Sequence, residues 1–195
     1  MTVLVLPGLH GSGPGHWQHA WLEDIEDSVL VEQRDWSRPD RGAWVETACR
    51  AVRAHPGALL VGHSLGAILI AHLAADHPEL PIGGALLVAP ADVEAAHDHH
   101  VVAGFAPLPS RPFAFPSILV ASRDDPWMPF DRARVLANIW ESALVDLGRA
   151  GHVNAESGLG RWAEGRRLLA RIDGVRRPSP ALRQRPSLHL VAAAG

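Results

Sequence analysis

Short apolar runs alternate with longer segments of helical periodicity along most of the chain. Several runs are nearly continuous Val, Leu and Ile, which is typical of parallel strands covered on both faces. The runs predict strands at Val3–Leu6, Val29–Glu32, Ala58–Gly62, Ala85–Ala89, Ser117–Ser122 and Ala143–Leu147. Helices are predicted between them, at His16–Asp24, Ala43–Ala54, Ser64–Asp76, Phe130–Trp140 and Gly160–Arg171. This alternation predicts an α/β fold, with a mostly parallel sheet and helices on both of its faces.

Two segments break the alternation. Asp92–Pro116 mixes Ala, His, Pro and Gly with weak periodicity, and we expect a short, minimal cap there. After Asp173 the chain becomes rich in Arg and Pro and contains no acidic residue. We therefore predict one domain over residues 1–173 and a basic, poorly ordered tail over 174–195 that the chemistry does not need.

Composition excludes several classes of protein. The 195 residues suit one compact domain, and a net charge of −3 argues against binding to nucleic acid. The single cysteine, Cys49, allows no internal disulfide and no cysteine-based zinc site. All 18 basic residues are arginine. Schiff-base chemistry, lysine-bound pyridoxal phosphate and a P-loop lysine are therefore excluded.

The first residues of the chain and the length of its apolar runs indicate where in the cell the protein is expected. Met1-Thr2 leads directly into the predicted strand Val3–Leu6, which is too short for the apolar region of a signal sequence and has no basic region before it. No apolar run approaches the length of a membrane span. We expect a cytoplasmic protein that needs no membrane and no obligate protein partner.

The motif Gly62-His63-Ser64-Leu65-Gly66 follows a predicted strand and opens a predicted helix. In that context G-x-S-x-G is typical of the sharp turn that presents the nucleophilic serine of an α/β-hydrolase. Glycines at both ends allow the strand and the helix to approach without Cβ clashes. Ser64 is therefore a candidate nucleophile.

Such a serine needs an acid and a base downstream, in the order Ser, Asp, His. Asp124 and Asp125 follow the predicted strand that ends at Ser122, which is where the acid is expected. Either aspartate could instead form a turn or cap a helix, and we prefer Asp125 as the acid. His152 is the expected base, because it lies in a glycine-flanked loop after the last predicted strand.

The loop after the first strand, Pro7–Gly11, is rich in glycine and can turn backbone amides toward the serine. We expect the amides of Leu9 and Leu65 to form an oxyanion hole. The glycine spacing does not fit the dinucleotide-binding pattern G-x-G-x-x-G. The substrate pocket is expected to include His10, Trp17, His63 and Trp127.

A cluster of His97, Asp98, His99 and His100 raises the question of a metal site. Adjacent histidines in a loop rarely supply the ligand geometry that zinc requires, so we favour a solvated loop of the short cap. Asp92 is interpreted as a helix cap rather than as an alternative acid. No metal and no organic cofactor is expected.

Taken together, these motifs resemble a known family, the small serine hydrolases typified by bacterial YdeN and vertebrate retinoblastoma-binding protein 9. The resemblance covers about residues 2 to 172 and is carried by Pro7–Trp21, Asp35–Trp44, His63–Gly66, Ala89–Asp92, Ser122–Pro126 and Gly151–Asn154. It implies a compact α/β-hydrolase with a short cap and a triad of Ser64, Asp125 and His152. Hydrolysis of small esters or amides is the activity that it leads us to expect.

The leading hypothesis is a serine hydrolase that acts on a small-molecule acyl substrate through an acyl-enzyme. The alternative is a non-catalytic or regulatory binding protein on the same fold, which a missing triad member would favour; none is missing. A cofactor-free haloperoxidase or an acyltransferase would use the same residues, and only substrate tests separate these from a hydrolase.

Overall fold

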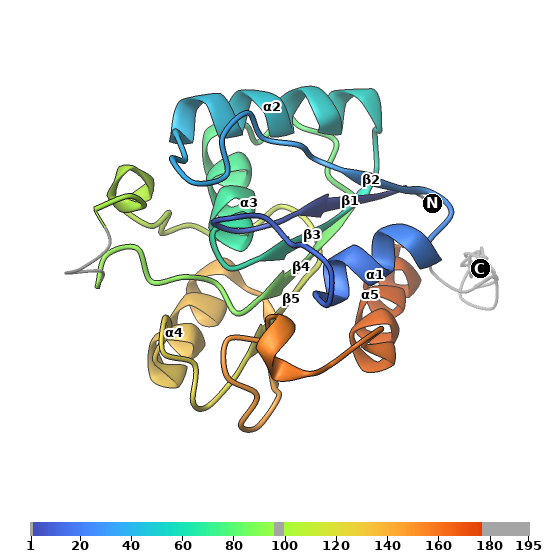
Figure 1. Ribbon diagram of the computed structural model, residues 1–195. Coiled ribbons are helices and arrows are strands. Elements are labelled where there is room, and N and C mark those ends of the chain that lie inside the picture. The colour runs from blue at the N-terminus through green and yellow to red at the C-terminus, as the bar shows by residue number, and fades with distance from the viewer. Residues whose placement is uncertain (1, 96–99, 177–195) are drawn as a thin grey trace, which may run out of the picture.

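A computed structural model of the chain describes residues 2–95 and 100–176 (Figure 1). Its centre is a six-stranded parallel sheet in the order β2-β1-β3-β4-β5-β6. The strands are β1 (Val3–Leu6), β2 (Ser28–Leu30), β3 (Leu59–His63), β4 (Gly84–Val88), β5 (Ser117–Ala121) and β6 (Ala143–Asp146). The strand order reverses between β1 and β3. The loops that follow these two strands therefore diverge and leave a crevice at the carboxyl edge of the sheet.

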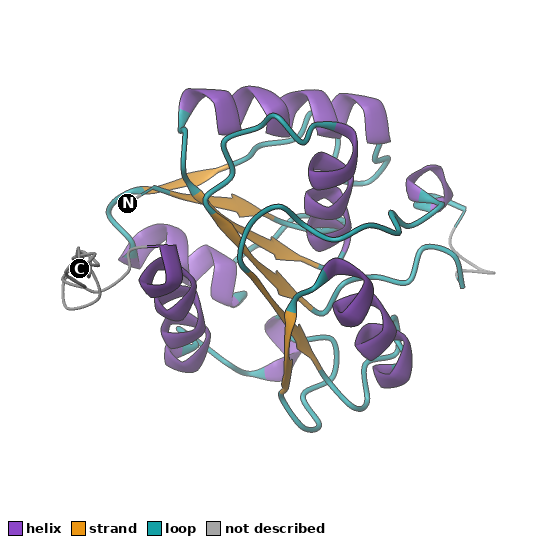
Figure 2. Cartoon of the chain, turned by 180° about the vertical axis from the view of Figure 1, so that it is seen from behind, coloured by secondary structure: helices purple, strands orange, loops and turns teal. Residues whose placement is uncertain are grey.

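Helices cover both faces of the sheet (Figures 1 and 2). They are α1 (Trp17–Asp24), α2 (Arg41–Ala54), α3 (Leu65–Asp76), α4 (Phe130–Trp140) and α5 (Ala163–Arg176). Helices α1 and α5 pack on one face, and α2, α3 and α4 pack on the other. This is the three-layer arrangement that the sequence pattern predicted.

Side chains of each central strand alternate between two cores. In β1, Leu4 and Leu6 join the core under α2 and α3, whereas Val3 and Val5 join the core under α1 and α5. Every residue of β1, β3, β4 and β5 is buried, while the edge strands β2 and β6 are partly exposed. Burial on both faces explains why the central strands read as continuous apolar runs.

Capping side chains move the starts of the first two helices from their predicted positions. Helix α1 begins after His16, because the His16 ring accepts a hydrogen bond from the Gln18 amide and so caps the helix. Helix α2 begins at Arg41, two residues before the prediction, because the side chain of Asp40 caps it. Both predicted starts were wrong by one or two residues for the same reason.

Backbone conformation moves the starts of two other helices. Ser64 has a φ of 53°, which is outside the helical region, so α3 begins at Leu65. Gly160 and Trp162 have φ values of 54° and 38°, so α5 begins at Ala163 rather than at Gly160. Helix α5 also continues past the predicted domain boundary at residue 173. The remainder of the predicted tail lies outside the described residues.

The segment between β4 and β5 forms the expected short cap in its described part. It contains a single turn of 3₁₀ helix, η1 (Ala103–Phe105). The Phe105 ring is fully buried and packs against Trp44, and the Phe105 carbonyl accepts a hydrogen bond from His72 Nε2 at 2.8 Å. These contacts fix this part of the segment against α2 and α3, so it does not form a separate layer.

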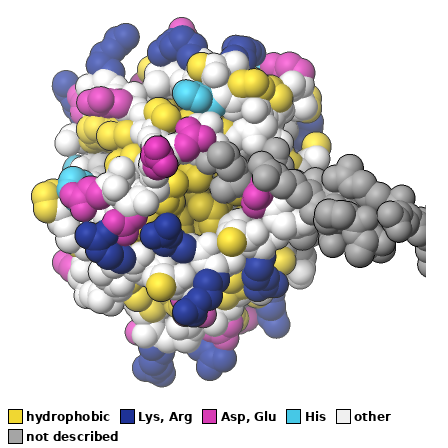
Figure 3. Space-filling model, turned by 90° about the vertical axis from the view of Figure 1, so that its right-hand side faces the viewer, with side chains coloured by type: hydrophobic (Ala, Val, Ile, Leu, Met, Phe, Trp, Pro, Cys, Tyr) yellow, Lys and Arg dark blue, Asp and Glu magenta, His cyan; other side chains and the backbone are white. Residues whose placement is uncertain are grey.

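On the face of the molecule viewed in Figure 3, arginine and acidic side chains are interspersed, without a large patch of one sign. In the part of the chain that the structure describes, no helix combines the length and the apolar character that a membrane crossing requires.

Candidate active site

Ser64 lies at the tip of a sharp turn between β3 and α3. Its φ of 53° and ψ of −120° are unusual for a residue other than glycine and indicate a strained backbone. A Cβ atom at Gly62 would lie 2.7 Å from the Ala67 nitrogen, and one at Gly66 would collide with the Leu6 carbonyl. Only glycine therefore fits at these two flanking positions, and the turn holds the serine hydroxyl above the sheet edge.

The predicted base reaches Ser64 from the loop after β6. His152 Nε2 lies 2.9 Å from Ser64 Oγ. The loop is anchored by the next residue, Val153, which is fully buried and whose carbonyl accepts a hydrogen bond of 2.7 Å from Trp17 Nε1. This anchor fixes the backbone immediately beside the imidazole.

The structure brings Asp125, rather than Asp124, to His152. The two carboxylate oxygens of Asp125 lie 2.9 and 3.0 Å from His152 Nδ1, and its side chain is only 2% exposed. Asp124 instead accepts hydrogen bonds from the Gly151 amide at 2.9 Å and from the Ser122 hydroxyl at 2.8 Å. The Gly151 bond, followed by the Ser122 bond, lowers the pKa of Asp124. Asp124 therefore holds the His152 loop as a structural carboxylate.

The loop after β1 passes directly beside the serine. A Cβ atom at Gly8 would lie 2.8 Å from Ser64 Cβ, so the loop depends on glycine here for its close approach. Among the described residues, no backbone acceptor is recorded for the amides of Leu9 and Leu65. Leu65 is also the first residue of α3, where a free amide is normal. These are the two amides that the sequence predicts for the oxyanion hole.

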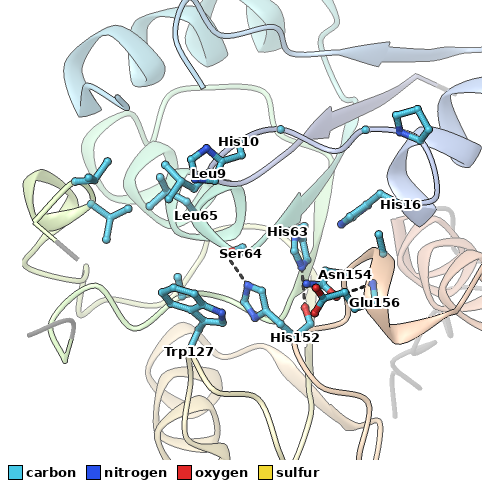
Figure 4. A pocket seen from close by; sticks show the side chains of 17 residues that line it. Leu9, His10, His16, His63, Ser64, Leu65, Trp127, His152, Asn154 and Glu156 are labelled. Carbon is cyan, nitrogen blue, oxygen red and sulfur yellow. Dashed lines mark hydrogen bonds between the residues drawn. The ribbon is translucent and has the colours of Figure 1, made fainter. Parts of the chain in front are cut away.

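A cavity of about 630 Å³ opens over Ser64 and His152 (Figure 4). Of the predicted pocket residues, His10, His63 and Trp127 line it. Trp17 does not: it is 1% exposed and packs against Trp21 and Trp162 in the core under α1 and α5. The expectation that Trp17 forms a pocket wall is therefore wrong, because the helix turns this side chain toward the sheet.

His63, the residue before the serine, is buried behind His152. Its Nε2 atom donates a hydrogen bond to the His152 carbonyl at 2.9 Å. Burial, and then the nearby His152 and His16 rings, hold the pKa of His63 well below its usual value. His63 is therefore neutral at physiological pH.

Sequence reasoning missed His16, Asn154 and Glu156, which line the same cavity. His16 is 6% exposed, and its ring packs against that of His63 with centroids 4.7 Å apart. Burial, followed by the charge of His152, lowers the pKa of His16 to about 4. As the first residue of a predicted helix, His16 gave no signal beyond its closeness in sequence to the loop after the first strand. Asn154 and Glu156 follow His152 closely, and that spacing was the available clue.

The remaining polar candidates lie outside the triad geometry. Asp92 accepts a hydrogen bond of 3.3 Å from the Glu94 amide and pairs with Arg132 at 3.4 Å. Asp92 thus stabilises a turn. The prediction that it caps a helix is wrong. Of the His97–His100 cluster, all but His100 lie outside the described residues.

The parallel sheet, the turn at Ser64 and the loops that converge on it define an α/β-hydrolase. The chain matches the family model described as serine hydrolase over residues 3–171, and it belongs to that family. No curated protein sequence matches the chain.

Solved structures agree with this assignment. A YdeN-like hydrolase of Pectobacterium atrosepticum is 34% identical over 90% of this chain and 91% of its own, with a TM-score of 0.80. The ydeN gene product of B. subtilis is 20% identical, over 89% of this chain and 98% of its own, with a TM-score of 0.72. Native esterase 2 of Thermogutta terrifontis is 16% identical, over 92% of this chain and 84% of its own, with a TM-score of 0.67. The last two show a shared fold, and the chain is a hydrolase.

Proposed function

We propose that the protein cleaves small esters or amides through an acyl-enzyme formed on Ser64. The observation that carries the proposal is the continuous set of hydrogen bonds from Asp125 through His152 to Ser64. Hydrogen bonds in this order activate a neutral serine hydroxyl as a nucleophile at neutral pH. A family of serine hydrolases and a neighbour named as an esterase support the same reaction class.

In the first step, Ser64 Oγ attacks the substrate carbonyl carbon while His152 Nε2 takes the hydroxyl proton. Asp125 accepts from Nδ1–H, which leaves Nε2 unprotonated and free to act as the base. The carboxylate also stabilises the imidazolium once it forms. His63 and His16 stay neutral beside it, so they add no like charge that would oppose protonation of His152.

The negative charge of the tetrahedral intermediate develops on the former carbonyl oxygen. The amides of Leu9 and Leu65 are available to receive it, because no backbone acceptor among the described residues occupies them. One such donor typically contributes about 3 kcal/mol to transition-state stabilisation. Placement of both donors on tight turns means that they need not reorganise during the reaction.

Collapse of the intermediate releases the alcohol or amine, which takes its proton from His152 Nε2. Water then enters, gives a proton to the same nitrogen and attacks the acyl carbon. The second intermediate expels Ser64 Oγ, which recovers its proton and leaves the free acid. In this cycle Ser64 is the nucleophile, His152 accepts and donates the protons, and water is the co-substrate.

A fluorophosphonate probe tests this proposal. The probe should react once per chain, and peptide mapping should find the adduct on the peptide that contains Ser64. The variant Ser64→Ala should remain unlabelled while keeping the wild-type melting temperature within a few degrees. Labelling of that variant, or a folded wild-type protein that resists the probe, would overturn the proposal.

A further inference from the structure

The cavity over Ser64 has two chemically different arms. On one side, called the apolar arm, Leu9, Leu65 and Trp127 line it, with His10 beside Leu9. The other, the polar arm, is formed by His16, Asn154 and Glu156. Figure 4 shows these groups on opposite sides of Ser64 and His152. A substrate whose scissile bond lies at Ser64 therefore extends into an apolar and a polar environment.

The protonation of His16 follows from its capping role. The Gln18 amide donates to His16 Nδ1 at 3.1 Å, so Nδ1 must be the unprotonated nitrogen. In a neutral imidazole the proton then resides on Nε2. Among the described residues this buried Nε2 has no hydrogen-bond partner. In Figure 4 the ring is directed toward the interior of the site, on the side of His63.

A buried donor without a partner suggests that a ligand supplies the acceptor. Leaving a buried N–H unpaired costs about 1–3 kcal/mol, so folded proteins rarely keep one without a reason. His16 is 6% exposed and lines the cavity, so we take a group bound in the polar arm as the missing partner.

Asn154 supplies a second donor by the same logic. Its Oδ1 accepts a hydrogen bond from the Glu156 amide at 3.0 Å and caps a short 3₁₀ turn, η2 (Ala155–Ser157). That bond assigns the opposite position to the amide group Nδ2. No partner of Nδ2 is recorded within residues 2–95 and 100–176. Both capping side chains thus use their acceptor atom on the backbone and leave a donor unused.

The charge of the cavity limits what these donors can bind. Glu156 is the sole acidic residue that lines it, and no arginine does so in the described part of the chain. His16 and His63 are neutral at physiological pH. A carboxylate or phosphate bound there would be repelled by the Glu156 carboxylate and would find no arginine to pair with among the described lining residues. An uncharged oxygen acceptor satisfies the donors without that penalty.

We propose that the polar arm recognises an uncharged acceptor oxygen of the substrate, through His16 Nε2–H and the Asn154 amide. This oxygen is an ether, hydroxyl or carbonyl group a few bonds from the scissile carbonyl, on either the alcohol or the acyl side. The proposal rests on the function proposed above. It makes His16 and Asn154 residues that determine specificity and leaves the chemical steps to the triad.

Two pairs of esters that differ by one oxygen test the proposal. On the alcohol side, 2-methoxyethyl butyrate is compared with n-butyl butyrate. On the acyl side, 4-nitrophenyl methoxyacetate is compared with 4-nitrophenyl butyrate. The measured quantity is the ratio of kcat/KM within each pair. Differences in intrinsic reactivity cancel when the ratio of a variant is divided by that of the wild type.

The key variants keep the caps and withdraw the donors from the positions they hold in the wild type. His16→Asn retains an acceptor for the Gln18 amide, since Asn is a favoured N-cap, and its remaining amide N–H ends one bond short of the position of His16 Nε2, too far to bind the same acceptor. Asn154→Asp retains the acceptor for Glu156 and loses the amide donor. Each should lower the oxygen preference about tenfold in one of the two pairs. His19→Asn is the matched control, because His19 lies on α1 outside this cavity.

The pair that responds identifies the side of the substrate that occupies the polar arm. If the wild-type enzyme hydrolyses these esters but neither donor variant changes either ratio, the inference is wrong. A change equal to that of His19→Asn would also contradict it. Failure of the proposed function would look different: the wild type would hydrolyse none of the esters and Ser64 would not react with the fluorophosphonate.

Discussion

The His63 side chain donates a hydrogen bond of 2.9 Å to the backbone carbonyl of His152, so the residue before the nucleophile holds the backbone of the base. Two sequence-distant loops are thereby locked together behind the reacting atoms. With Nε2 protonated as the donor, the neutral ring carries no proton on Nδ1. Burial favours this neutral form. This contact predicts that His63 is a positioning residue.

We expect His63→Phe to lower kcat about tenfold and to leave KM nearly unchanged. The phenyl ring fills the same space, but the His152 carbonyl loses its partner and the imidazole is less well placed. The part-buried carbonyl left without a partner should also cost up to about 1–3 kcal/mol of unfolding free energy. Steady-state kinetics and urea unfolding measure the two effects. An unchanged kcat in a destabilised variant would show that His63 has only a structural role.

The pH dependence of stability should follow from the buried histidines. The pKa of His16 is about 4 in the folded protein instead of 6.5, first because of burial and then because of His152. As the pH falls below 6.5, the unfolded chain binds a proton that the folded protein rejects, so stability is lost toward pH 4. At about pH 5 the loss from His16 is on the order of 2 kcal/mol.

Urea unfolding at about pH 7.5 and about pH 5 measures this loss. The His16→Asn variant should show a smaller difference between the two pH values, since its side chain does not titrate. The lowered pKa of Asp124 affects stability only at more acidic pH, below the ordinary aspartate value of 3.8. Identical pH dependence in the variant and the wild type would contradict the burial argument.

The two neighbouring aspartates offer a matched comparison. Asp125→Asn should lower kcat by up to about 10⁴-fold, because the amide can favour the wrong tautomer of His152. Asp124→Asn should reduce kcat far less, since Asp124 binds the Gly151 amide and the Ser122 hydroxyl instead. Similar kcat values for the two variants would remove Asp125 from the catalytic set.

Gly8 provides a test of the loop beside the nucleophile. Gly8→Ala should lower kcat at least tenfold, because the new Cβ atom would lie 2.8 Å from Ser64 Cβ and displace the Leu9 amide. Gly104→Ala serves as the control, since a Cβ atom there meets nothing within 4 Å among the described residues. If both variants kept wild-type kcat, the loop after β1 would have no part in oxyanion stabilisation.

Much of this architecture follows from local sequence. The central strands were predictable because burial on both faces makes them continuous apolar runs, and the Ser64 turn was predictable because Gly62 and Gly66 are required for its packing. The choice between Asp124 and Asp125 was harder. The residues alone gave a preference, but both aspartates follow the same strand, and only the fold separates them by their partners.

Other features depend on tertiary contacts that sequence patterns do not encode. Trp17 was expected in the pocket, yet α1 directs it into a tryptophan cluster with Trp21 and Trp162. His16 was not singled out, since its orphan nitrogen arises only when the cap bond and the cavity wall are both formed. Helix starts were misplaced where a cap or a positive φ, rather than periodicity, decides the first residue.

The most direct measurement is the site of acylation during turnover. The protein is mixed with excess 4-nitrophenyl butyrate, quenched in acid before the substrate is exhausted, digested and analysed by mass spectrometry. We predict a butyryl group on the peptide that contains Ser64, lost on further incubation without substrate and absent from Ser64→Ala. Turnover of the ester with an unmodified Ser64 peptide, or an acyl group on another residue, would contradict the account.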